Sequence, residues 1–222
     1  SLRVNQVVSG VAINLSAAGL TTYGARLLFE QGTVDLPSIT PMQVPVLADI
    51  PVLGVLFSQD ALFYLLLVLL GLGTYSLFYT RWGLSLRAVG NMPQAADTAG
   101  VSVTRARYIS VILCGGLCGL AGAYLALVHV GFFTENMSAG KGFIALAALI
   151  FGRWHPIATF FACLLFGATE ALQLRIQAFG LEIPYQFLAM LPYVTALLAL
   201  TGIAGNAVPP AALGVPYAKE KS

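Results

Sequence analysis

The sequence predicts an all-α protein that crosses a membrane several times and forms a single transmembrane domain over residues 1–222. Of its 222 residues, 58% are hydrophobic and only 9% are charged, and the mean hydropathy is +0.85. A soluble domain normally carries about 25% charged residues. Several uncharged stretches also reach the length of about 20 residues that a membrane helix needs. The composition excludes a disordered chain, and three cysteines exclude a disulfide-rich scaffold.

Four stretches between charged residues are long enough to span a membrane: residues 4–25, 61–80, 108–134 and 183–218. The last has room for one helix that ends near residues 202–205, followed by a proline-rich tail. The chain starts with Ser1 rather than with methionine, directly ahead of the first stretch. We therefore expect it to be the C-terminal portion of a longer protein.

Two further segments are shorter. Residues 142–152 are uncharged between Lys141 and Arg153, which is too short to cross a membrane and typical of a half-helix or re-entrant segment. A span at about residues 156–175 follows and contains Glu170. The sequence therefore predicts about six membrane segments, one of them short or discontinuous.

Charged residues in the loops predict the orientation. The loop 81–107 holds four arginines against one acid, Asp97, whereas the loop 27–60 holds four acids and no lysine or arginine. Because Lys and Arg in short loops mark the cytoplasmic side, we expect loop 81–107 inside and loop 27–60 outside. The sequence thus predicts a multi-pass protein of the cytoplasmic membrane. The net charge of +2 is too small to favour a nucleic-acid partner.

The cytoplasmic loop 81–107 carries the signals of a short surface helix. Gly90-Asn91 reads as a turn with Asn91 as N-cap, and Pro93 is tolerated in the first helical turn. Residues 94–99 form the predicted helix, and Gly100 can end it in the left-handed conformation. The small face of Ala95, Ala96 and Ala99 lets another protein approach closely. An ordinary capped loop helix, or a site for lipid phosphates between basic flanks, explains the same pattern.

Several blocks also carry a family resemblance. Gly90–Val101, preceded by Leu86–Val89, resembles the coupling loop of binding-protein-dependent ABC importer permeases, in the branch with ribose, branched-chain amino-acid and nucleoside permeases. Residues 5–14, Gly142–Pro156 and Glu170–Gln173 are similar to the nucleoside and simple-sugar members of that branch.

This resemblance implies an ATP-driven importer that translocates a nucleoside or simple sugar. Its partners would be a cytoplasmic ATP-binding subunit, a second permease subunit that is identical or related, an extracytoplasmic solute-binding protein and membrane lipid. The short helix would seat in a groove of the ATP-binding subunit. The residues that we expect to couple to it are Gly90, Asn91, Pro93, Ala95, Ala96, Ala99 and Gly100.

Polar residues inside the spans are candidates for the substrate pathway, because burying them in lipid is costly. Asn14, Glu170 and Gln173 are the leading ones, and Glu170 and Gln173 share a helix face. Such groups can accept hydrogen bonds from sugar hydroxyls or base N–H groups. The alternatives for Glu170 are an ion pair with Lys141 or Arg153 and an interhelical hydrogen bond.

The remaining motifs indicate packing rather than chemistry. Gly115, Gly119 and Gly122 in the span 108–134 favour close helix packing. Cys114 and Cys118 lack the histidine or acid that would complete a metal site. We expect no catalytic residue, metal or cofactor, and no P-loop motif is present, so ATP hydrolysis belongs to a separate subunit. An ion-gradient-driven secondary transporter or channel is the alternative function, and an intramembrane enzyme a weaker one.

Overall fold

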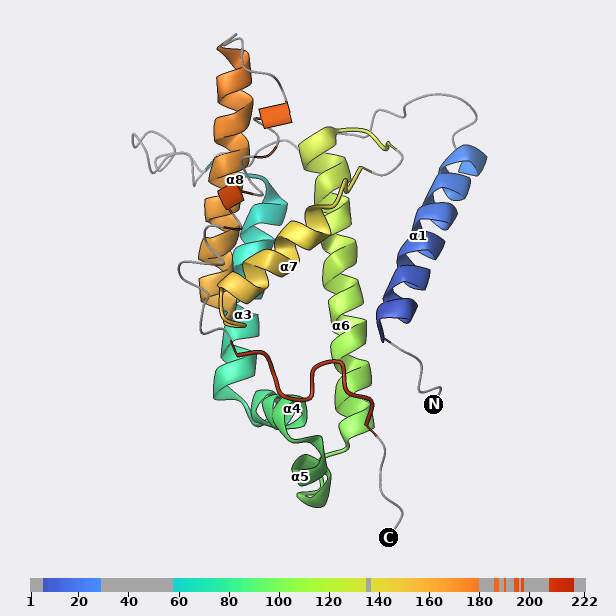
Figure 1. The fold of residues 1–222 in the computed structure, drawn as a ribbon, viewed down its shortest axis with the longest axis vertical. Coiled ribbons are helices and arrows are strands. Elements are labelled where there is room, and N and C mark those ends of the chain that lie inside the picture. Colours follow the sequence, from blue (N-terminus) through green and yellow to red (C-terminus); the bar gives the residue numbers. More distant parts are fainter. Residues whose placement is uncertain are drawn as a thin grey trace. The chain divides into compact units, whose positions relative to one another are not determined.

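The computed structural model describes residues 6–28, 58–134, 137–179 and 208–217, with a few residues between 186 and 197. Every regular element in this part of the chain is a helix, which agrees with the predicted all-α class (Figure 1). In chain order the helices are α1 (Gln6–Leu28), α3 (Ala61–Tyr79), α4 (Arg81–Asn91), α5 (Pro93–Thr98), α6 (Val103–Tyr124), the π-helix η1 (Leu125–Val130), α7 (Lys141–Phe151) and α8 (Pro156–Ala178).

Three of the described helices are long and apolar enough to cross a membrane. They are α3, the continuous helix Val103–Val130 formed by α6 and η1, and α8. The helices predicted at 61–80, 108–134 and 156–175 are therefore present, although the second begins five residues earlier, at Val103. The short segment predicted at 142–152 is the apolar helix α7, whose 11 residues are too few to span.

Two of the predicted spans are not among the described helices that can cross a membrane. The stretch 4–25 does form a helix, α1, but α1 is not among the three described helices that are apolar enough to cross. Polar residues along it, such as Asn14 and Thr21, lower its hydropathy. The span predicted within 183–218 and most of the loop 27–60 lie outside the described residues. Six membrane segments and their orientation therefore stay predictions.

The chain divides into two compact units. One comprises residues 1–69, 92–139 and 214–222 and contains α1, α5, α6 and η1. The other comprises residues 70–91 and 140–213 and contains α4, α7 and α8, and the boundary falls within α3. The single domain over 1–222 stays a prediction.

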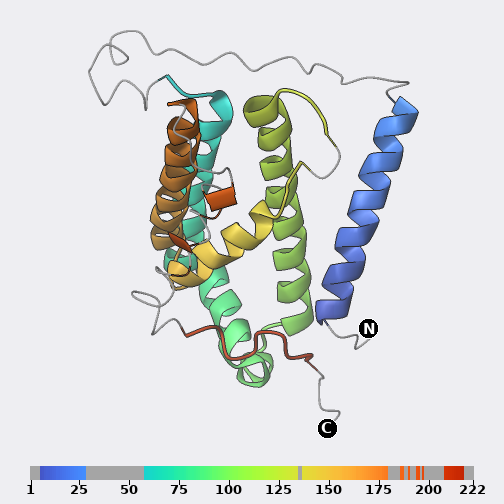
Figure 2. The same ribbon diagram turned by 45° about the horizontal axis from the view of Figure 1, so that its top comes forward.

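In the first unit, α6 continues into η1 without a break (Figure 2). In a π-helix each N–H bonds to the carbonyl five residues back, and the N–H of Gly131 does so to Ala126 at 3.0 Å. Gly131 then ends the helix with φ of +79°, a conformation that glycine adopts without a steric penalty. The sequence predicted one uniform span here and not its π-helical end.

In the second unit, α7 and α8 form a V-shaped helical hairpin whose arms diverge from a tight turn (Figures 1 and 2). Ala148 of α7 is buried against Ala162 and Phe166 of α8, and Ile144 and Phe151 pack around them. Two alanines at this contact let the helix backbones approach closely, which is the common way in which helices associate in membranes.

Helix α4 was not predicted. Asn91 is its last residue and Met92 takes the N-cap position of α5, so the prediction of Asn91 as N-cap was wrong. Trp82, Leu86 and Val89 recur at helical spacing, and this pattern continues the helix through the Gly90-Asn91 pair that we took for a turn. Val89 is buried, which fixes one face of α4 in its unit.

Candidate functional site

The first candidate site is α5, whose two ends are defined by its sequence. Pro93 occupies the first helical position, where its missing N–H costs no hydrogen bond. At the other end the N–H of Val101 donates to the Ala96 carbonyl at 2.9 Å, and the N–H of Gly100 donates to the Asp97 carbonyl at 3.0 Å. This pair of bonds is a Schellman motif, and Gly100 has the left-handed φ of +85° that it requires. The predicted roles of Pro93 and Gly100 in shaping the helix are confirmed.

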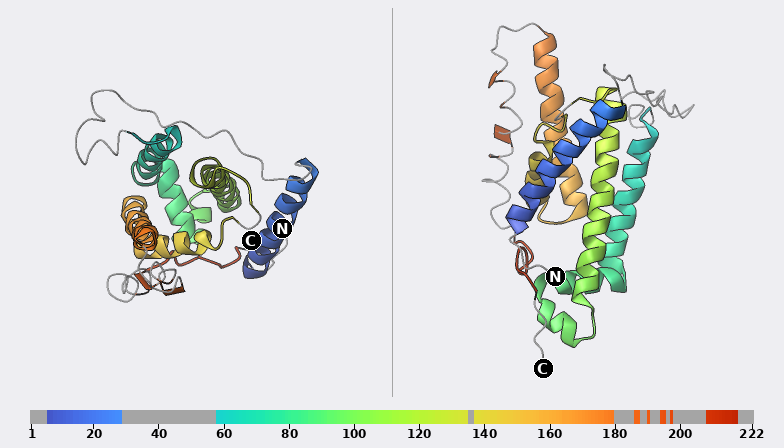
Figure 3. Two further views of the ribbon diagram at one scale, coloured as in Figure 1. Left: turned by 90° about the horizontal axis from the view of Figure 1, so that it is seen from above. Right: turned by 90° about the vertical axis from the view of Figure 1, so that its right-hand side faces the viewer.

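The small face of α5 divides into covered and accessible residues. Ala96 is only 4% exposed. Helix α5 contacts α6, whose Val103 is 1% exposed (Figure 3). Ala95 and Ala99 are exposed, as are Gly100 and Asn91. Because its own chain covers Ala96, a partner protein can meet only Ala95 and Ala99 of the predicted face.

The described C-terminal tail contacts the residues on either side of α5 in the sequence. In one unit, the N–H of Ala212 donates to the Gly90 carbonyl at 3.0 Å, and Pro210 lies beside Gly90. In the other unit, Nη1 of Arg107 donates to the Val215 carbonyl at 3.0 Å. Gly90 stands in the last turn of α4, where carbonyls lack helical partners. The tail therefore satisfies a carbonyl at the end of α4.

The second candidate site is the α7–α8 hairpin, which is closed at its turn by a very tight contact. A Cβ atom on Gly152 would overlap the backbone and hydroxyl of Thr159, so only glycine fits there. Arg153 and Trp154 follow with φ of +52° and +61°, values that non-glycine residues seldom adopt. The turn therefore brings the end of α7 and the start of α8 into direct contact.

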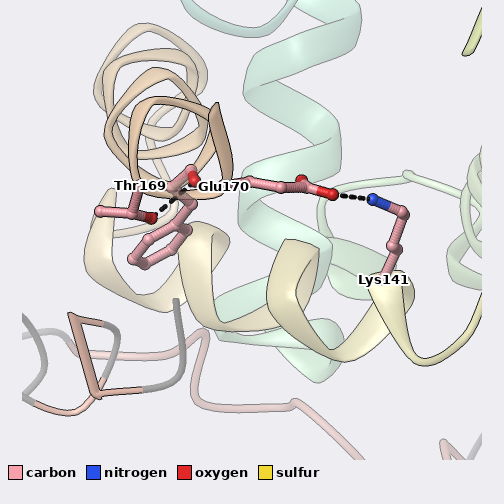
Figure 4. A network of polar contacts seen from close by, with 4 residues as sticks. Lys141, Thr169 and Glu170 are labelled. Carbon is pink, nitrogen blue, oxygen red and sulfur yellow. Dashed lines mark hydrogen bonds and ion pairs between the residues drawn. The ribbon is translucent and has the colours of Figure 1, made fainter. Parts of the chain in front are cut away.

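The open end of the hairpin is bridged by an ion pair. Nζ of Lys141, the first residue of α7, donates to Oε1 of Glu170 on α8 at 2.5 Å, and the two side chains point toward one another (Figure 4). Within the chain, 38% of the Lys141 side chain and 43% of the Glu170 side chain are exposed. An unpaired carboxylate in a membrane span is costly, and this lysine compensates it. The pairing matches one of the two ion pairs considered for Glu170.

Other polar groups of α8 continue the same face. Gln173 is half-buried, one turn after Glu170. Gln177 follows at the next helical repeat, and its Nε2 is buried without a hydrogen-bond partner among the described residues. Gln177 was not predicted from the sequence, although its i+7 spacing from Glu170 indicates the shared face. Asn14 lies in α1, in the other unit, and is exposed.

Among the described residues, the glycines and cysteines of α6 are exposed. A Cβ on Gly115, Gly119 or Gly122 would meet no atom of the described residues within 4 Å. Their packing role therefore stays a prediction. Cys114 and Cys118 are exposed free thiols, and no group of metal-binding side chains occurs in the described ranges.

Comparison with known proteins decides the family. Residues 1–205 match the family described as "Branched-chain amino acid transport system / permease component". The chain belongs to this permease family. It is accordingly the non-catalytic, multi-pass component of an ABC importer in the cytoplasmic membrane, and the three apolar helices agree with that setting.

Individual relatives carry more specific names. The permease is 42% identical over 227 residues to the guanosine ABC transporter permease protein NupQ of Bacillus subtilis, covering all of the chain and 71% of the relative. It is also 42% identical over 226 residues to the nucleoside ABC transporter permease protein NupC of Lactococcus lactis, with the same coverage. The putative glucose ABC transporter permease protein TsgC13 of Haloferax volcanii is 37% identical over 82% of the chain and 56% of that relative. No solved structure matches the chain.

Proposed function

We propose that the permease imports a nucleoside and that α5 receives the force of ATP hydrolysis from a separate ATP-binding subunit. The observation that carries the proposal is α5 itself: a short, exposed helix with both ends structurally defined, in a chain of this permease family. The names of the two relatives that cover the full chain support a nucleoside as substrate.

The coupling role follows from the shape of α5. Ala95 and Ala99 present methyl groups rather than long side chains, so a groove of the ATP-binding subunit can approach the helix backbone. The contact between α5 and α6 passes a displacement of α5 to a membrane helix. ATP shifts the equilibrium between outward- and inward-facing states if the ATP-bound subunit contacts α5 differently in the two states.

The other partners are those of a binding-protein-dependent importer. A second permease subunit, identical or related, completes the pathway, and an extracytoplasmic solute-binding protein delivers the substrate. The exposed glycines Gly115, Gly119 and Gly122 offer a surface on which another membrane helix can pack closely. Lipid covers the remaining apolar surface of α3, α6 and α8.

The polar face of α8 is the proposed substrate contact. Glu170, Gln173 and Gln177 provide carboxylate and amide groups that can bond the N–H groups of a base and the hydroxyls of a ribose. Asn14 on α1 is a further candidate. In this arrangement Lys141 holds the Glu170 carboxylate in place until substrate hydrogen bonds replace part of that interaction.

Uptake in cells that express the complete transport system tests the function. We expect radiolabelled guanosine to accumulate in these cells and not in cells that lack this subunit. Excess unlabelled adenosine or uridine should compete, whereas leucine should not. A sugar is the second candidate, favoured by the glucose-permease relative. Competition by glucose with no competition by nucleosides would replace the nucleoside assignment.

A further inference from the structure

Three side chains form a stack that links three elements of one compact unit. The Cζ of Arg87, on α4, lies 4.9 Å from the ring centroid of Phe78, near the end of α3. The ring of His155, directly ahead of α8, lies with its centroid 4.7 Å from that of Phe78 at an interplanar angle of 32°. Phe78 therefore contacts α4 through one neighbour and the tip of the hairpin through the other.

The α4 side of this stack is held rigidly to the end of α3. The hydroxyl of Thr80, the residue between the two helices, accepts a hydrogen bond from the Gly83 N–H at 3.1 Å and donates one to the Ser76 carbonyl at 2.5 Å. A Cβ on Gly83 would overlap the carbonyl oxygens of Ser76 and Leu77. The corner between α3 and α4 thus has no room to bend, and a displacement of α4 moves the end of α3 with it.

The backbone of His155 is hydrogen-bonded into the hairpin on both sides. The backbone N–H of His155 donates to the Gly152 carbonyl at 3.0 Å, and the His155 carbonyl accepts from the Thr159 N–H at 2.9 Å. Gly152 and Thr159 are in tight contact across the turn. A displacement of the His155 ring is therefore a displacement of the whole tip of the hairpin, the element that carries Glu170 further along.

We propose that the stack Arg87–Phe78–His155 transmits motion from α4, which only Met92 separates from α5, to the tip of the α7–α8 hairpin. The inference rests on the proposed function, because α5 must receive the push. Phe78 is a positioning residue in this role. Its side chain is half-buried, so its loss leaves little cavity and affects transmission more than folding. Contacts of this kind carry coupling only if the linked elements move together, which double mutants can measure.

The experiment uses the complete transporter in proteoliposomes and measures substrate molecules imported per ATP hydrolysed. Phe78→Leu removes the ring at similar volume and should lower this ratio at least threefold, with normal co-purification of the ATP-binding subunit. Phe78→Tyr keeps a ring and should retain most of the ratio. Phe161→Leu is the matched control, since Phe161 is an exposed ring of α8, 63% accessible, and should change nothing.

A second variant keeps the inference testable if Phe78→Leu fails to fold. Arg87 is exposed, so Arg87→Gln leaves the core intact and should lower the ratio in the same way. The double variant should lose no more than either single one. An unchanged ratio in both single variants, with normal transport by the wild type, would overturn the role of the stack alone. A wild-type chain that never binds the ATP-binding subunit would overturn the proposed function, and with it the basis for the stack.

Discussion

Nζ of Lys141, the first residue of α7, lies 2.5 Å from Oε1 of Glu170 and joins α7 to the second half of α8, where the two helices diverge. At the other end of the hairpin, Gly152 and Thr159 hold the same helices in direct contact. Between these points the buried residues are Ala148, Ala162 and Phe166, which form a narrow apolar contact. The hairpin is thus held by steric fit at its turn and by the Lys141–Glu170 ion pair where its helices diverge.

The ion pair should show a measurable coupling energy. Lys141→Met leaves the Glu170 carboxylate unpaired and should destabilise the permease more than Glu170→Gln, because the amide still accepts a hydrogen bond from the lysine. Residues in direct contact typically couple by about 0.5–3 kcal/mol. Thermal unfolding of the detergent-purified subunit, followed by circular dichroism, gives the values. The charge-swapped double variant Lys141→Glu with Glu170→Lys should recover part of the loss. Additive losses would show that the two side chains act independently.

The turn of the hairpin should not tolerate a methyl group. Gly152→Ala places a Cβ into Thr159 and should lower stability by about 1–3 kcal/mol, the usual cost of overpacking. Gly142→Ala, near the start of α7, meets no described atom within 4 Å and should be neutral or slightly stabilising, because alanine favours a helix over glycine. The midpoints of thermal unfolding compare the two. Equal midpoints would contradict the tight contact.

The two faces of α5 should respond differently to a large charged residue. Ala95→Arg leaves the packing of α5 intact and should abolish uptake and co-purification of the ATP-binding subunit without lowering thermal stability. Ala96→Arg forces a charge into a position that is 4% exposed and should lower thermal stability as well. Ala95→Ser, which stays small, is the control and should transport normally. Normal uptake by Ala95→Arg would remove α5 from the coupling role.

The end of α5 should depend on glycine at one position. Gly100 has a φ of +85°, and alanine in this region costs about 1–2 kcal/mol. Gly100→Ala should therefore loosen the Schellman motif and speed hydrogen exchange at the Gly100 and Val101 amides. Gly119→Ala, in the right-handed α6, should leave these amides unchanged. Exchange that is equally slow in both variants would show that the motif does not need glycine.

Charge spacing and hydropathy predicted the helices best. The bracketing charges Lys141 and Arg153 located α7 to within a residue or two, because an apolar run between two charges has few ways to fold. The same reasoning named Lys141 among the partners of Glu170, but sequence alone left Arg153 equally eligible. The choice depends on the turn at Gly152, which aligns Lys141 with Glu170 when the chain doubles back.

Tertiary contacts explain what could not be predicted. Ala95 and Ala96 are identical in chemistry, and only the packing around α5 makes Ala95 exposed and Ala96 buried. Helix α4 was missed because Gly90-Asn91 is a turn signal in isolation, whereas the buried Val89 and the Ala212 hydrogen bond keep this end helical. Local propensity gives way to such contacts.

The π-helix at the end of α6 has a consequence for mapping the lipid-facing surface of this helix. An α-helix turns by about 100° per residue, and a five-residue hydrogen bond encloses one residue more than the usual four. Side chains after Leu125 are therefore rotated relative to the pattern set by Val103–Tyr124. In a spin-label scan along residues 103–130, the accessibility of the labels to lipid should vary with helical periodicity, and the phase of this variation should shift where α6 meets η1. A single helical wheel drawn through both helices would assign His129 to the wrong side.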